Sequence, residues 1–209
     1  MSAVTSIAPT PVPLSLSSAL PSNPPLLPPS AVVGQNAPYG SPDASLFEAT
    51  MVGDVDAASA ALAAGASPHY RNSHGITPLL VACGGVGPLA MVELLLAAGA
   101  GADAADPAGW TPLVYVASSG QLHLMEALLA AGAAVNPPPA ERGWTPLARA
   151  AFRGQAGAVA RLLRAGGNAA AEVEGVGCLA LAEAGGHAEA AALLREHAAA
   201  AGSGGGLPR

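Results

Sequence analysis

A segment that ends in Ala-Gly recurs at a nearly constant interval, and this repetition constrains the fold more than any other feature of the chain. The four copies are AALAAGA at 60–66, LLLAAGA at 94–100, ALLAAGA at 127–133 and RLLRAGG at 161–167. Their glycines, Gly65, Gly99, Gly132 and Gly166, are 34, 33 and 34 residues apart. A fixed period of this length predicts a solenoid, in which each unit packs only against its neighbours.

A second motif, Thr-Pro-Leu, follows the same period and predicts where a helix begins. Its threonines are Thr77, Thr111 and Thr145. A threonine at the N-cap accepts hydrogen bonds from free amides of the first turn, and proline is favoured at the first helical position. Each unit is therefore predicted to hold a short first helix, a glycine turn and a second helix with apolar residues at helical spacing. The second helix is predicted to stop at the recurring glycine, which tolerates a left-handed cap.

The two motifs together resemble the ankyrin repeat, whose period is 33 and whose signature is T-P-L-H-x-A. The matching stretches are GITPLLVA at 75–82, GWTPLVYVA at 109–117 and GWTPLARAA at 143–151. The resemblance implies an all-α solenoid of helix-turn-helix units with hairpin loops. It spans residues 43–199 and divides them into five units: 43–72 as an N-terminal cap, 73–105, 106–139, 140–172, and 173–199 as a C-terminal cap.

The chain departs from the family pattern at the histidine that joins neighbouring loops. Its positions are taken by Leu80, Val114, Ala148 and Ala180. We therefore expect lower stability and more mobile loops than in a consensus array.

Both ends of the chain differ in composition from the repeats. Residues 1–42 contain no charged residue and are rich in proline, which predicts a largely disordered arm. Within it, PPLLPP at 24–29 is either a spacer or a polyproline segment that docks on an aromatic surface. Residues 200–209 predict a flexible Gly-rich tail.

Charge and cysteine content restrict the class of partner and the compartment. The net charge is -6, and the chain has no lysine, which argues against a nucleic-acid or membrane partner. Gly, Pro or charge interrupts every apolar run before the length of a membrane span. Two cysteines fit a reducing compartment, so we expect a cytoplasmic or nuclear monomer, with plastid targeting as an alternative.

Few residues suggest chemistry. His69 and His74 lie five apart with Cys83 further on, but a third and fourth zinc ligand at suitable spacing are missing. Cys178 replaces the proline of the motif at the first turn of a helix, a position that can lower a thiol pKa, so redox sensing is a minor hypothesis. CGGVG at 83–87 lacks the lysine of a phosphate loop. We expect no catalytic, metal or cofactor site.

The two tryptophans of the chain, Trp110 and Trp144, occupy the same position of consecutive units, and Ile76 occupies it in the unit before. In the family this position lies in the hairpin loop and points from the concave binding face. The resemblance therefore implies an exposed apolar ladder of binding anchors. The alternative is that each indole packs on the neighbouring loop. The predicted face also includes loop and first-helix residues: Ser73, His74, Glu141, Arg142, Ser118, Ser119, Phe152 and Arg153.

The function implied is a non-enzymatic interaction module, an adaptor, scaffold or inhibitor that binds a protein or peptide on its concave face. Two alternatives stay open: a targeting subunit that delivers clients to degradation or phosphorylation machinery, and a fragment of a larger protein with a separate catalytic domain. An enzyme or small-molecule binder would need a deep pocket with convergent polar groups, for which short alanine-rich helices leave little room.

Overall fold

The computed structural model describes residues 38, 40–85 and 87–203. Most of the predicted N-terminal arm, and residues 204–209 of the predicted tail, lie outside this range. The described part consists of five pairs of antiparallel helices. In chain order they are α3 (Pro42–Val52), α4 (Val55–Ala63), α5 (Pro78–Gly84), α6 (Leu89–Ala97), α7 (Pro112–Ser119), α8 (Leu122–Ala130), α9 (Pro146–Phe152), α10 (Ala156–Arg164), α11 (Cys178–Ala184) and α12 (Ala188–Ser203).

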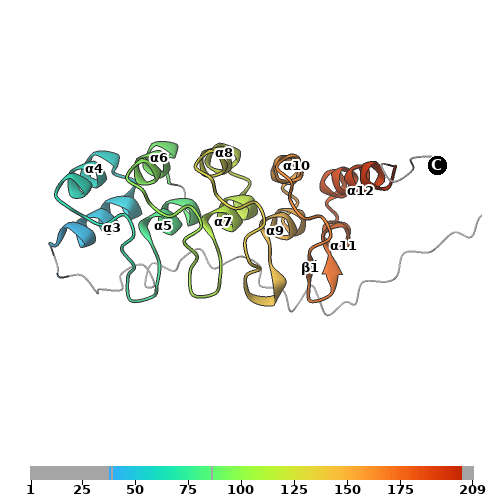
Figure 1. Ribbon diagram of the computed structural model, residues 1–209, viewed down its shortest axis with the longest axis horizontal. Helices are drawn as coiled ribbons and strands as arrows, with labels where there is room; N and C mark the ends of the chain where they lie inside the picture. The colour runs from blue at the N-terminus through green and yellow to red at the C-terminus, as the bar shows by residue number, and fades with distance from the viewer. Residues whose placement is uncertain (1–37, 39, 86, 204–209) are drawn as a thin grey trace, which may run out of the picture.

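The pairs stack side by side into an elongated solenoid of two helical layers (Figure 1). The inner layer holds α3, α5, α7, α9 and α11, and the outer layer holds α4, α6, α8, α10 and α12. Hairpin loops extend from the inner helices on the side away from the outer layer. Each helix packs on the same helix of the next unit, as in the contacts of α7 with α5 and α9. The predicted all-α solenoid is therefore confirmed.

The first helices of the central units begin where the Thr-Pro-Leu motif predicts. The Thr77 hydroxyl accepts from the Leu80 amide at 3.3 Å, and Thr145 caps α9 in the same way at 3.2 Å. Thr111 differs, because its side chain makes no capping bond and its buried oxygen has no hydrogen-bond partner among the described residues. Proline still occupies the first position of α7, so the helix start does not depend on the threonine hydroxyl.

The second helices of the first four units end at the recurring glycines. Gly65, Gly99, Gly132 and Gly166 have φ of 95°, 88°, 88° and 86°. These angles lie in the left-handed region that glycine enters without a steric penalty. The chain then enters the loop that leads to the next unit.

The ends of the solenoid extend slightly beyond the predicted boundaries. Ser41 caps α3, which begins at Pro42. At the other end α12 runs to Ser203, so the prediction of a flexible tail from residue 200 is wrong for residues 200–203. Alanine is the best helix former, and a run of alanines through this segment extends the helix. The last loop forms a small antiparallel hairpin of β1 (Glu172–Val173) and β2 (Val176–Gly177).

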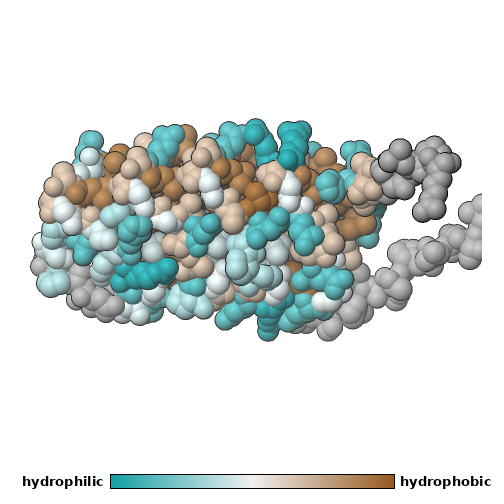
Figure 2. Space-filling view, viewed as in Figure 1, coloured by the Kyte–Doolittle hydropathy of each residue, from teal (hydrophilic) through white to brown (hydrophobic). Residues whose placement is uncertain are grey.

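The core lies between the two helical layers and continues from unit to unit. The leucine of each Thr-Pro-Leu motif, Leu79, Leu113 and Leu147, is at most 1% exposed. Hydrophilic residues lie over the loops and inner helices and along the outer edge of the molecule, and apolar residues appear between the outer helices (Figure 2). None of the described helices is long and apolar enough to cross a membrane.

Candidate protein-binding face

Three hairpin loops share one backbone design, which places the residue before each Thr-Pro-Leu motif. A backbone hydrogen bond from an amide to a carbonyl closes each loop. It runs from Asn72 to Ile76 at 3.0 Å, from Asp106 to Trp110 at 3.1 Å and from Ala140 to Trp144 at 2.8 Å. A left-handed glycine precedes the placed residue in every loop, at Gly75, Gly109 and Gly143. Ile76, Trp110 and Trp144 are thus equivalent in space as well as in sequence.

Side chains reinforce two of these loops. Asn72 Oδ1 accepts from the amides of His74 and Ile76, and Asp106 Oδ1 accepts from the amides of Ala108 and Trp110. In the third loop Ala140 has no side chain that can do this. There the loop instead forms a short 3₁₀ turn, η1 (Glu141–Gly143), with Arg142 in the left-handed region at φ 61°.

The two indoles stack on each other and on a buried arginine. The Trp110 and Trp144 rings lie 6.4 Å apart at 29°, and Trp144 meets Phe152 edge-on at 5.4 Å. The guanidinium of Arg149, on α9, lies over three rings: 4.9 Å from Trp144, 5.2 Å from Trp110 and 5.6 Å from Phe152. A cation over an aromatic face is attracted by the ring quadrupole. We call Trp110, Trp144, Arg149 and Phe152 the inner stack.

The predicted exposure of the apolar ladder is wrong. Ile76, Trp110 and Trp144 are 4%, 6% and 1% exposed. The physical reason is that equivalent positions of consecutive units are close enough for the rings to stack, and Arg149 fills the remaining side of the pair. The packing alternative therefore describes these three side chains.

Arg149 is 0% exposed, which is unusual for a charged side chain. Its Nε donates to the Ser118 hydroxyl on α7 at 3.2 Å. Burial, together with the nearby positive charge of Arg153, lowers the pKa of Arg149 to about 10. At neutral pH the guanidinium is still protonated, so a positive charge lies within the inner stack.

Tyr115 and Asp106 link α7 to its own loop. The Tyr115 hydroxyl donates to Asp106 Oδ2 at 2.8 Å, and its ring lies 6.3 Å from Trp110. Burial raises the pKa of Tyr115 well above its usual range, and the charge of Asp106 and their hydrogen bond raise it further. Asp106 thus holds the loop by its Oδ1 atom and the helix by its Oδ2 atom.

The other predicted face residues differ in exposure. Ser73, His74, Glu141, Arg142, Ser119 and Arg153 are exposed, Phe152 is half-buried, and Ser118 is buried at 4%. Arg142 pairs with Glu174 of the next loop at 3.5 Å. The Ser119 hydroxyl accepts from Gln121 Nε2 at 2.8 Å. The exposed part of the face is therefore polar, with both signs of charge, whereas its buried part is aromatic.

The residues that the sequence reasoning missed are Arg149, Tyr115 and Asp106. A signal existed for Arg149, because it is the one charged residue inside the otherwise apolar helix PLARAAF. Asp106 occupies the same loop position as Asn72, which is a typical turn residue. Nothing in the sequence indicated that the Tyr115 hydroxyl reaches Asp106.

Neither cysteine has the environment of a reactive thiol. Cys83 and Cys178 are both buried, and burial raises the pKa of each, that of Cys178 to about 11. The hypothesis that the helix start lowers the Cys178 pKa is therefore wrong. The Cys178 thiol donates to the Ala171 carbonyl at 3.4 Å, and desolvation outweighs the helix terminus.

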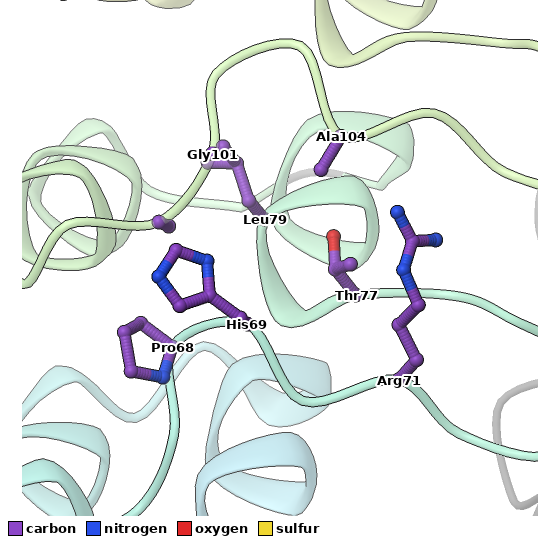
Figure 3. Close-up of a pocket in the computed structure, with 8 residues that line it drawn as sticks. Pro68, His69, Arg71, Thr77, Leu79, Gly101 and Ala104 are labelled. Atoms are coloured by element: carbon purple, nitrogen blue, oxygen red, sulfur yellow. The ribbon is translucent and has the colours of Figure 1, made fainter.

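A small cavity lies beside the first hairpin loop, between His69, Arg71 and the loop of the next unit (Figure 3). Its volume is about 70 Å³, far below the several hundred Å³ of a metabolite pocket. The Arg71 side chain is held in place, because its Nη1 donates to the carbonyls of Gly75 at 2.6 Å and Ala105 at 2.8 Å. Within the described ranges, no three His, Cys, Asp or Glu residues gather as metal ligands would.

Stacked helix pairs with hairpin loops on one side define the chain as a repeat solenoid. The model of the ankyrin-repeat family, in three copies, matches residues 46–139. Residues 46–139 therefore hold ankyrin repeats, and the same helix pairs continue through α12. A search of curated proteins found no match. Ankyrin repeats generally mediate protein–protein interaction, and the fold is typically non-catalytic.

Proposed function

We propose that the chain is a non-enzymatic binding module that recognises a protein or peptide with the exposed rim of the inner face. The rim consists of His74, Glu141, Arg142, Ser119 and Arg153. The observation that carries the proposal is that Glu141, Arg142 and Arg153 are exposed on the same loop and helix that hold the buried part of the inner stack. Four packed side chains from a loop pair and from α9 fix the backbone beneath the exposed groups, so that binding costs little ordering entropy.

The chemistry of the rim favours a polar partner. Exposed groups of both signs, Glu141, Arg142 and Glu174, lie on neighbouring loops, and Arg142 is close enough to Glu174 to form an ion pair. Such a surface supplies specificity through charge complementarity more than through apolar burial. The buried indoles support the surface instead of contacting the partner. The role of the complex, whether adaptor, scaffold or inhibitor, follows from the identity of that partner.

Affinity capture with a matched pair of charge reversals tests this proposal. Arg153→Glu reverses a charge on the rim, and Arg164→Glu reverses one at the end of α10 in the outer layer. Both arginines are exposed, so neither change removes a buried side chain. We expect a partner held by the wild-type chain and by Arg164→Glu to be lost from Arg153→Glu. Equal retention by both variants would rule out the rim around Arg153 as the binding surface.

A further inference from the structure

Two junctions between neighbouring units share a hydrogen bond from a loop amide to a side-chain oxygen of the unit before. The amide belongs to the second residue after the recurring glycine, and the acceptor is the fourth residue after the glycine of the preceding unit. Asp103 Oδ1 accepts from the Ala134 amide at 2.9 Å, and Asn136 Oδ1 accepts from the Asn168 amide at 2.8 Å. A carboxylate or carboxamide oxygen is therefore the group that this position of the array uses.

The junction between the first and second units lacks this bond. His69 occupies the position that an aspartate and an asparagine hold in the two following units. The equivalent amide, that of Gly101, makes no hydrogen bond with any described residue. Even the first unit, which has no unit before it, supplies an acceptor for its own amide, because Asp43 Oδ1 accepts from Ser67 at 2.7 Å. Gly101 is thus the exception in an otherwise regular series.

The cavity beside the first hairpin loop lies at this junction, and its lining includes both His69 and Gly101 (Figure 3). Its volume of about 70 Å³ holds several water-sized groups, which is enough for the carbon and two oxygens of a carboxylate. His69 is exposed, so a ligand can reach the cavity from solvent. The cavity therefore lies where the following junctions hold a side-chain oxygen.

The polar side chains of the lining supply donors and positive charge. Thr77 is only 2% exposed; its hydroxyl oxygen accepts from Leu80, and its hydroxyl hydrogen has no acceptor among the described residues. The Arg71 guanidinium donates to two carbonyls through Nη1 but forms no ion pair with a described carboxylate. The imidazole of His69 carries an N–H in every protonation state. An ionised acceptor bonds to such groups more strongly than a neutral one.

Among the described residues, no acidic side chain lines the cavity, although two lie in the loop beside it. Asp103 reaches away to the amide of the next unit. Asp106 is occupied by the amides of its own loop and by the Tyr115 hydroxyl. Arg71, in contrast, is the only lysine or arginine of the sequence before Arg142. The charge that lines the cavity is therefore positive within an otherwise acidic half of the chain.

We propose that this cavity binds a carboxylate group of a ligand from outside the chain. The carboxylate oxygens accept from the Gly101 amide and the Thr77 hydroxyl, and Arg71 supplies the opposite charge. The rest of the ligand lies in solvent, because the cavity has no room for it. An acidic side chain or the terminal carboxylate of a protein supplies such a group. The site shares no residue with the rim, so this inference goes beyond the proposed function.

An NMR titration of the isotope-labelled full chain with sodium acetate tests the proposal through the amide resonance of Gly101. We expect a saturable downfield shift of this resonance, because a charged acceptor deshields the amide proton. We expect no saturable shift with acetamide, which has the same shape without the charge, or with sodium chloride at equal ionic strength.

A matched pair of variants locates the effect. In His69→Asp the new side chain supplies the acceptor, as Asp103 does for the next unit, so the Gly101 resonance is expected downfield before acetate is added and its response to acetate is lost. His74→Asp places the same charge at an exposed position outside the cavity lining. It is expected to respond to acetate as the wild type does.

Two peptides distinguish the sources of the carboxylate. Acetyl-Gly-Glu-Gly-amide carries it on a side chain, and acetyl-Gly-Gly-Gly with an unblocked end carries it at the terminus. A saturable Gly101 shift with either peptide supports the site and identifies its source, whereas a response to acetate but to neither peptide overturns the proposal.

Three further results would also overturn the proposal. Acetamide or chloride could move the Gly101 resonance as far as acetate does, or acetate could act equally on the wild type and on His69→Asp. Inorganic phosphate could bind more tightly than acetate, which would make the cavity a site for a tetrahedral anion. None of these results depends on capture of a partner, so each leaves the proposed function of the rim untouched.

Discussion

Arg149 shows how a single residue determines the character of a face. In helix α9 it is surrounded by apolar residues, yet its guanidinium lies over three aromatic rings and its Nε bonds to Ser118. Removing a charge from water is costly, and the lowered pKa of Arg149 reflects that cost. Contact with aromatic faces offsets part of it. The result is a positive charge that organises the loops without being accessible itself.

The two buried cysteines lead to a prediction for alkaline pH. Because burial raises both thiol pKa values, the unfolded chain loses these protons at lower pH than the folded chain. Stability contributed by the thiols is complete below their unfolded pKa of about 8.5 and falls as pH rises above it, by up to about 1.4 kcal/mol per pH unit for each thiol. For Cys178 the loss continues until the pH passes about 11.

Urea unfolding of the wild type and of Cys83→Ala/Cys178→Ala, from about pH 8 to about pH 10, measures this effect. We expect the free energy of unfolding to decline less steeply with pH in the double variant. Identical slopes would contradict the raised pKa values.

At the scale of the element, glycines in the left-handed region shape the loops, but they differ in how much space a side chain would have. Gly143 and Gly132 have nearly the same backbone, with φ of 89° and 88°. A Cβ at Gly143 would lie 2.7 Å from the carbonyl oxygen of Glu172, whereas a Cβ at Gly132 would meet nothing within 4 Å. Gly143 therefore permits close contact between loops, whereas Gly132 only ends a helix.

This pair separates backbone strain from steric contact. Gly132→Ala is expected to cost about 1–2 kcal/mol, the penalty of a side chain in the left-handed region. Gly143→Ala should cost about 1–3 kcal/mol more, because the hairpin of the next unit must also move. Chemical denaturation of both variants measures the difference. Equal losses would show that the loop of Gly143 and the β1–β2 hairpin do not press on each other.

Much of each element could be predicted from the repeat, since the spacing of Thr77, Thr111 and Thr145 placed the start of three helices. The hydroxyl of Thr111 nevertheless makes no cap, although proline still occupies the first position of that helix. The candidate site was predicted less well. The period showed that Trp110 and Trp144 are equivalent but not that their rings touch, and it gave no sign that Arg149 covers them. Contacts between units depend on the distance between neighbouring loops in space, and the spacing of a motif along the sequence does not give that distance.

At the scale of the whole molecule, the main contacts among the described helices join each unit to itself and to the next unit. The first pair, α3 and α4, and the last pair, α11 and α12, each have a neighbouring pair on one side only. In such an array stability is a sum of unit and interface terms, so the ends open more readily than the middle. The inner stack joins the second and third loops and adds to the stability of the centre.

Hydrogen exchange followed by mass spectrometry tests this gradient. We expect the slowest exchange in α7 and α9 and the fastest in α3 and in the end of α12. Uniform protection along the described helices would instead indicate that the array unfolds as one cooperative block, with interfaces stronger than the units.

The central claim is that the tryptophans support the binding face and do not form its contact surface. The free energy of unfolding of Trp144→Ala tests it most directly, with Trp144→Phe as the control that keeps a ring. We predict a loss of about 3–5 kcal/mol for the alanine variant and a smaller loss for phenylalanine. An alanine variant with wild-type stability that no longer captures the partner would contradict the account, because the indole would then be a contact and not a support.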